Sequence, residues 1–256
     1  MRDADSGERN PGSRDDGSRN DGSRNGKDGG GSGAGAATGA GAGSGAGTGA
    51  SGPLEARTGP RTIPGLGPAT RAGIPPGAAQ AVVVTGINRD SNLASVTVYE
   101  RDPVTGWEAV TEEWPAHNAL NGWTDDHREG DLRSPIGVYG LTDAGGRLAD
   151  PGTRLPYDRG PAFSVSGFGF EGEPLEGSFD YVVAINYNRS PGNTPLDWTR
   201  PLGTEKGGGI WIHVDHGGPT QACVAVERER MRELLRMLDP AKEPVVVMGD
   251  EDSLMK

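Results

Sequence analysis

Residues 210–226 read IWIHVDHGGPTQACVAV, which is two apolar segments separated by the turn-forming residues 217–219 (GGP). Aliphatic side chains alternate along each segment, as is typical of β-strands with one buried face. A chain reversal at Gly218 predicts a hairpin in which His213 lies opposite Cys223. Opposed strand residues have Cβ atoms about 4.5–5.5 Å apart. The pattern therefore predicts that the aliphatic residues enter the core while His213 and Cys223 face a cleft.

Short apolar segments of the same kind continue on both sides of this stretch. We expect strands at residues 80–87, 93–101, 107–114, 134–141, 162–167, 179–187 and 245–248. One segment has helical spacing, because Met231, Leu234, Leu235 and Leu238 form a single apolar face before Pro240 ends the helix. The predicted fold class is mainly β, a compact β-rich domain with one late helix.

The N-terminal part of the chain has a different composition. The 256 residues include 44 Gly and 20 Pro, and no aromatic residue precedes Tyr99. Residues 1–77 are rich in Gly, Ser, Ala and Pro and have almost no large apolar side chain to offset the entropy of ordering. We therefore expect a disordered arm at 1–77, a folded domain at 78–250 and a short tail at 251–256.

Charge and composition exclude several classes of protein. The formal net charge is −11, and no basic stripe is present to attract nucleic acid. No run of apolar residues is long enough to span a membrane. The single cysteine, Cys223, rules out an internal disulfide. The first 30 residues contain no apolar stretch of the kind a secretory signal needs. We expect a monomer without a cofactor.

A thiol and an imidazole on one cleft suit nucleophilic catalysis. An ordinary cysteine has a pKa of about 8.5, so an adjacent His213 would have to accept the proton of Cys223 or stabilise its thiolate. Backbone N–H groups of Ala222 and Cys223 would then form an oxyanion hole. The alternative is structural, because a lone cysteine commonly packs as a small apolar group.

Two further hypotheses concern the histidines, one for a metal site and one for solvated loops. A zinc site would draw on His213, Asp215, His216 and Cys223, since zinc takes His, Asp and Cys ligands. Strand alternation points His213 and His216 to opposite faces, and the sequence has no other His/Cys cluster, so no metal site is predicted. His117 and His127 fall in a polar loop region and are expected to be solvated.

Several motifs together resemble the L,D-transpeptidase (YkuD-type) catalytic domain of bacterial cell-wall enzymes. The resemblance covers roughly residues 80–249. It rests on the segments 129–131 (EGD), 134–139 (SPIGVY), 181–189 (YVVAINYNR), 212–213 (IH), 220–223 (TQAC) and 245–249 (VVVMG). The chain departs from the family pattern at Ala222, where Gly is usual, at Ala225, where Arg is usual, and in the short spacing from His213 to Cys223.

The resemblance implies an activity and a location. Cys223 would attack the bond between the third residue and the terminal D-alanine of a peptidoglycan stem peptide. The thioester would then be resolved by a diamino-acid side chain of a neighbouring stem, giving a 3→3 cross-link. His213 would act as general acid and base, oriented by a backbone carbonyl. The implied location is extracytoplasmic, at the cell wall.

The resemblance also implies substrate contacts and leaves two alternatives open. Residues implied to bind substrate are Tyr187, Arg189, Gly217, Gly218 and Thr220. Water as the acceptor would make the protein an L,D-carboxypeptidase. A non-catalytic peptidoglycan-binding module that kept the fold is the remaining possibility.

Overall fold

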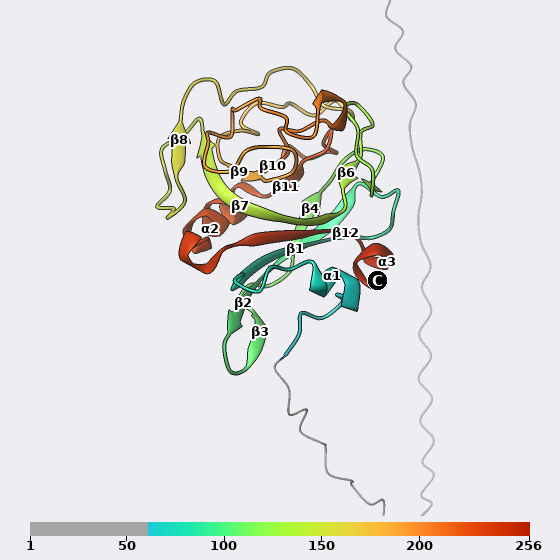
Figure 1. Cartoon of the computed structure of the whole chain (residues 1–256). Helices are drawn as coiled ribbons and strands as arrows, with labels where there is room; N and C mark the ends of the chain where they lie inside the picture. Colours follow the sequence, from blue (N-terminus) through green and yellow to red (C-terminus); the bar gives the residue numbers. More distant parts are fainter. Residues whose placement is uncertain (1–60) are drawn as a thin grey trace, which may run out of the picture. The chain divides into compact units, whose positions relative to one another are not determined.

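The computed structural model describes residues 61–256 and is mainly β (Figure 1). Its strands are β1 Gln80–Gly86, β2 Leu93–Asp102, β3 Gly106–Ala109, β4 Trp114–His117, β5 Trp123–Thr124, β6 Ser134–Pro135, β7 Gly137–Gly146, β8 Tyr157–Arg159, β9 Val182–Ile185, β10 Trp211–Val214, β11 Val224–Val226 and β12 Val245–Asp250. Its α-helices are α1 Pro68–Ala72, α2 Arg228–Met237 and α3 Glu251–Leu254, and its 3₁₀ turns are η1 Thr204–Lys206 and η2 Pro240–Lys242.

Most of the strands form one sheet that closes on itself like a barrel. The order is β1-β12-β7-β9-β10-β11-β4-β2, and β2 pairs again with β1. The strands β3 and β8 extend this ring from β2 and β7. Neighbours are antiparallel except for β1–β12 and β10–β11 within the ring and β7–β8 beside it. Closure leaves the ring without an exposed edge.

The inside of the ring is filled by alternate residues of the strands. This inner cluster includes Val82, Val96, Ile212 and Val224, all fully buried. Helix α2 completes it with Met231, Leu234 and Leu235, as the helical spacing predicted, and Leu238 is buried beside them. Full burial of each such side chain is worth about 1.5–3 kcal/mol.

A second cluster covers the outer face of β1 and β12 with the two ends of the described chain. Ile63 and Leu66 pack there with Val247 and Leu254, and each is at most 4 % exposed. The carbonyls of Leu254 and Lys256 accept hydrogen bonds from residues 67 and 69, so α1 and α3 lie side by side (Figure 1). The predicted arm therefore extends too far, because residues 61–77 belong to the folded body. Residues 251–256 are not a loose tail either. The rest of the predicted arm, 1–60, lies outside the described residues.

A third cluster lies on the outer face of β9 and β10. Val182, Ala184 and Trp211 are covered there by Phe163, Phe179 and Leu196, which come from long loops. Figure 1 shows these loops gathered over β9, β10 and β11, on the side of the molecule away from α1 and α3. Both faces of β10 are therefore buried, although the alternation in its sequence is typical of a strand with one exposed face.

Several predicted strand boundaries were wrong. The segment 107–114 is divided between β3 and the start of β4, because the chain leaves the sheet between them. Residues 162–167 form no strand, and Phe163 is buried as a loop anchor instead. Strands β5 and β8 were not predicted; they have two and three residues. Within 61–256, no helix combines the length and the apolar character needed to cross a bilayer.

Candidate active site

The strands that carry the predicted catalytic pair run parallel, so the predicted hairpin is wrong. In the ladder between β10 and β11, His213 pairs with Ala225 and Ile212 with Val224. Residues 215–223 therefore form a loop that returns the chain to the start of a parallel strand. The predicted faces are still correct, since side chains alternate regardless of strand direction. Ile212 and Val224 enter the inner cluster, whereas His213 and Cys223 lie on the outer face beneath the loops.

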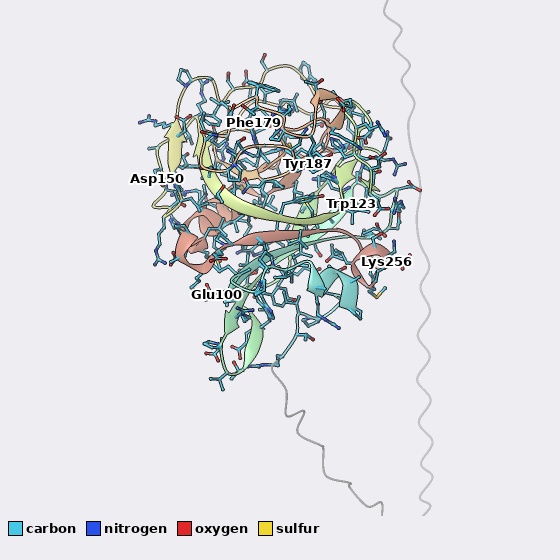
Figure 2. The ribbon with its side chains drawn as sticks, in the orientation of Figure 1. Glu100, Trp123, Asp150, Phe179, Tyr187 and Lys256 are labelled. Carbon is cyan, nitrogen blue, oxygen red and sulfur yellow. The ribbon has the colours of Figure 1, made fainter. Side chains whose placement is uncertain are left out.

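His213 and Cys223 line one cavity of about 420 Å³. This volume lies within the usual range for small-molecule sites, about 300–1,000 Å³. Its floor includes Ile210 and Ala222. Its walls carry aromatic side chains from three loop positions, Phe168, Phe170 and Phe179. Figure 2 shows Phe179 among the side chains of the loops above β7. The sheet thus supplies the candidate pair, Cys223 and His213, and the loops enclose it.

The imidazole of His213 is fixed in one tautomer by its own strand. The side chain is buried, and its Nδ1 lies 2.9 Å from the carbonyl oxygen of Val214. A carbonyl oxygen only accepts, so Nδ1 carries the proton and Nε2 presents a lone pair. The ring of Phe179 packs edge-on against it at 5.4 Å. Burial lowers the pKa of His213 to about 4, so the imidazole is neutral at neutral pH.

The thiol of Cys223 is also held in its neutral form. Burial raises its pKa to about 11, and the Trp211 N–H, which lies 3.4 Å from Sγ, opposes this shift. The thiol in turn points toward the Gly209 carbonyl at 3.9 Å. Gly209 has a φ of 67°, a left-handed conformation that favours glycine, which brings this carbonyl to the thiol. The resting pair is therefore a neutral thiol and a neutral base.

Side chains from two segments hold the loop before Cys223. Thr220 Oγ1 donates to the carbonyl of Cys223 over 2.7 Å, and Ser134 Oγ donates to the carbonyl of Ala222 over 2.9 Å. In residues 61–256 the backbone N–H groups of Ala222 and Cys223 donate to no protein acceptor. Two free donors beside the thiol are the arrangement an oxyanion hole needs. The sequence did not identify Ser134, because its role depends on a contact between distant segments.

Four of the five residues predicted to bind substrate do not line the cavity; only Thr220 does. Arg189 is buried in an ion pair with Asp143, at 2.8 Å, where it fixes the segment after β9 to β7. The hydroxyl of Tyr187 donates to the His127 carbonyl, and its ring packs in the loops above β7 (Figure 2). Gly217 and Gly218 lie in the loop between β10 and β11, and Gly218 packs against the carboxylate of Glu173.

The other histidines also differ from their predicted places. His216 lies beside His213, with ring centroids 5.8 Å apart and planes 14° apart, because β10 ends at Val214 and alternation stops there. His127 is 5 % exposed and lines the cavity instead of being solvated. His117 is half-buried and forms an ion pair with Asp215, 2.9 Å from Nδ1. The hydrogen bond to Asp215 raises the pKa of His117.

Several cavity residues were not predicted at all. Phe168 and Trp198 stand at its rim with 75 % and 78 % of their surface exposed. Glu129 is the carboxylate that lines the cavity, and neither Lys nor Arg lines it among the described residues. The signal available was the pair of aromatics in the Gly-rich segment 167–172, which has no strand or helix pattern to account for them.

No metal site and no similarity to a known protein is found for this site. In the described part of the chain, no cluster of three or more His, Cys, Asp or Glu side chains is close enough to hold a metal ion. No protein-family model, curated protein or solved structure matches the chain.

Proposed function

We propose that this protein is a cysteine-dependent L,D-transpeptidase that acts on peptidoglycan stem peptides through a thioester. The observation that carries the proposal is the placement of Cys223 and His213 on one cavity wall, with the Val214 carbonyl fixing the tautomer of His213. The motif resemblance supports the same residues in the same roles. It also names the substrate class, which the cavity alone does not.

In the proposed acylation step each of these groups has one role. The Cys223 proton passes to Nε2 of His213 as Sγ attacks the carbonyl carbon between the third residue and the terminal D-alanine. The developing oxyanion is stabilised by the N–H groups of Ala222 and Cys223. His213 then gives its proton to the departing amine of D-alanine, the C–N bond breaks, and a thioester to Cys223 remains.

The neutral resting pair supports this order of events. Because the thiol is held neutral and the imidazole is a free base, proton transfer accompanies attack instead of preceding it. A buried thiolate would be costly in the same cavity. The deacylation step needs a nucleophile that enters the same cavity, which is the amine of a second stem peptide in the proposed reaction.

Mass spectrometry of the intact protein tests this proposal. The chain is incubated with a disaccharide tetrapeptide, with and without a second stem peptide as acceptor. We expect a covalent adduct on Cys223, release of D-alanine and a cross-linked dimer, all absent in Cys223→Ala. Release of D-alanine without a dimer would identify an L,D-carboxypeptidase instead. Binding without an adduct would identify a non-catalytic module and overturn the proposal.

A further inference from the structure

His216 is a second histidine in the cavity that the acylation step does not use. Its side chain is 5 % exposed, and its ring lies nearly parallel to that of His213. It lines the same cavity as Cys223. A buried polar side chain at this position needs a partner, since leaving it unpaired costs free energy.

Glu173, in the loop above the cavity, is the charged group that forms an ion pair with His216. Its Oε1 lies 3.3 Å from Nδ1 of His216, and its side chain is 10 % exposed. Its Oε2 accepts a hydrogen bond from the N–H of residue 171. The carboxylate fits between two glycines, because a Cβ at Gly169 or Gly218 would lie 1.9 or 2.4 Å from Oε1. The two backbones thus leave room for one carboxylate against His216.

This contact determines which nitrogen of the His216 ring carries the proton. Neither Nδ1 of His216 nor Oε1 of Glu173 has a partner with hydrogen-bond geometry among residues 61–256, so their contact is electrostatic. A carboxylate oxygen at 3.3 Å repels a nitrogen lone pair and therefore favours the ring proton on Nδ1. The lone pair is then on Nε2, the other nitrogen of a ring that lines the cavity. His216 and Glu173 therefore form a carboxylate–histidine pair whose imidazole lines the cavity, beside the pair formed by His213 and Val214.

Aminolysis of a thioester creates a need for such a base. An alkyl amine arrives at neutral pH as an ammonium ion, which has no lone pair with which to attack. His213 is committed to the proton that attack releases and that the departing thiolate takes up. One base is therefore insufficient for an acceptor that must first lose a proton.

We propose that His216, held by Glu173, is the catalytic base that takes the proton from the incoming ammonium group of the acyl acceptor. This inference rests on the proposed transpeptidase function and assigns its second half. It also accounts for the charge of the site, since the Glu173 carboxylate attracts an ammonium ion and balances the imidazolium that forms.

The protons and bonds balance in this scheme. The ammonium gives one proton to Nε2 of His216 and becomes an amine. The amine nitrogen attacks the thioester carbonyl, forming the C–N bond, and its second proton passes to Nε2 of His213. The C–S bond breaks, and His213 returns this proton to the sulfur of Cys223. The products are the amide, the thiol and a protonated His216, which loses its proton to solvent.

The charged and titratable groups that surround His216 come from three segments. His213 stacks on it from β10, Glu173 faces it from the loop, and Asp215 precedes it in the same turn. Asp215 is engaged with His117 of β4. The thiol of Cys223 lines the same cavity, and the backbone N–H groups of residues 173 and 171 hold the pKa of Glu173 below its usual value.

The test separates thioester formation from thioester aminolysis. His216→Asn and Glu173→Gln are compared with Glu171→Gln, an exposed carboxylate in the same loop. Each protein is first loaded with the tetrapeptide donor and then mixed with one of two acceptors. The first acceptor is a stem peptide whose amine is protonated at neutral pH, and the second is trifluoroethylamine, which is already unprotonated.

We expect His216→Asn to form the thioester at the rate of the unsubstituted protein. Its transfer to the stem-peptide amine should fall about 10²–10⁴-fold, the usual effect of losing a general base. Transfer to trifluoroethylamine should stay near the unsubstituted rate, and the lost rate should return as the pH approaches the pKa of the acceptor. Glu173→Gln should behave in the same way more weakly, and Glu171→Gln should leave both reactions unchanged.

Two results would overturn the inference. An equal loss with both amines would mean that His216 only shapes the cavity, and no loss with either would mean that it has no part in transfer. If the unsubstituted protein forms no thioester, the proposed function itself fails and this inference falls with it. The thioester measurement therefore distinguishes the two failures.

Discussion

The hydroxyl of Thr220 donates a hydrogen bond of 2.7 Å to the carbonyl oxygen of Cys223, three residues further along the loop that precedes β11. Thr220 is itself buried and bonded through its backbone to Asn118. This bond sets the direction of the peptide that precedes β11. It therefore controls where the thiol and the free N–H groups of the loop point.

Replacing Thr220 with valine should test this constraint. Thr220→Val keeps the shape but leaves the buried Cys223 carbonyl with only a longer contact to Ser134, so we expect a loss of about 1–2 kcal/mol in unfolding free energy. Thr220→Ser keeps the hydroxyl and should lose less. Denaturant titration gives the stability, and thioester formation gives the effect on the site. Equal behaviour of the two variants would remove Thr220 from the site's framework.

The reactivity of Cys223 should respond to pH in the manner of a buried thiol. Its raised pKa, about 11, predicts that iodoacetamide labelling of the folded protein continues to rise beyond about pH 10. A solvated thiol is half-ionised at its pKa of about 8.5, and its labelling levels off by about pH 10. Mass spectrometry of the labelled chain at a series of pH values gives the profile. A plateau below pH 8 would instead indicate a thiolate stabilised in the resting site.

Removing the thiol should cost little stability. Cys223 packs against the third cluster and also lines the cavity, so removing its thiol enlarges a cavity that is already present. Cys223→Ala should therefore lower the unfolding free energy by about 1 kcal/mol, at the small end of the cavity penalties. Thermal unfolding by circular dichroism checks this, and it shows that a loss of acylation in this variant is chemical.

Acid should destabilise the protein through His213. Its pKa is about 4 when folded, against about 6.5 in an unfolded chain, so between these values the unfolded chain binds a proton that the folded protein does not. Stability from this group therefore falls as the pH drops from about 6.5 to about 4, by on the order of 3 kcal/mol. His213→Gln should flatten that part of the stability profile.

His117 provides a control of opposite sign. Its hydrogen bond to Asp215 raises its folded pKa, so its contribution is fully present below the unfolded value and is lost as the pH rises through the folded value. His117→Gln should thus cost more stability at pH 6 than at pH 9. If both variants change the profile in the same direction, the protonation states assigned here are wrong.

Arg189 should behave as a structural residue rather than a substrate ligand. It and Asp143 are each 3 % exposed, so removing one partner leaves a buried charge. Arg189→Met should lower the unfolding free energy by about 3–5 kcal/mol, and adding Asp143→Leu should restore part of this loss. A substrate ligand would give the reverse pattern, with a raised KM and unchanged stability. Denaturant unfolding and a donor titration decide between them.

Much of the fold was predictable because periodicity is local. Val96 and Val98 lie on one face of β2 and in the inner cluster, as their alternation indicated. The face of β10 that carries His213 was predicted for the same reason. Strand direction is different, since alternation is identical in parallel and antiparallel strands. The GGP turn favoured a hairpin, but the loop it belongs to returns the chain to the same end of the sheet.

The parts of the site that escaped prediction depend on distant contacts. From the sequence, Arg189 could bind a substrate, whereas in the structure it is paired with the buried Asp143. Nothing in the sequence between the two residues indicates that pairing. His216 was placed away from Cys223 by extending the strand pattern beyond Val214, where the strand ends. Residues 61–66 were assigned to the arm because Ile63 and Leu66 are isolated apolar residues, and their burial depends on β12 and α3.

The closed order of the sheet has a consequence for how the chain folds during synthesis. Strand β1 is the first strand of the described chain, yet its residues 81–86 pair with β12, the last. Contacts between such distant residues slow folding, because a long loop must close before any of them forms. Until β12 leaves the ribosome, β1 and β7 each present an unpaired edge, of the kind that associates with other chains.

Strand β12 and helix α3 thus hold the ring of strands closed. Strand β12 fills the space between β1 and β7, and α3 then packs on the segment that holds α1. A chain that ends before Val245 keeps every residue of the cavity but lacks the strand that closes the ring. Such a product should collect in aggregates, and its sedimentation beside the full chain in a cell-free synthesis reaction would measure how much of the folding waits for the last strand.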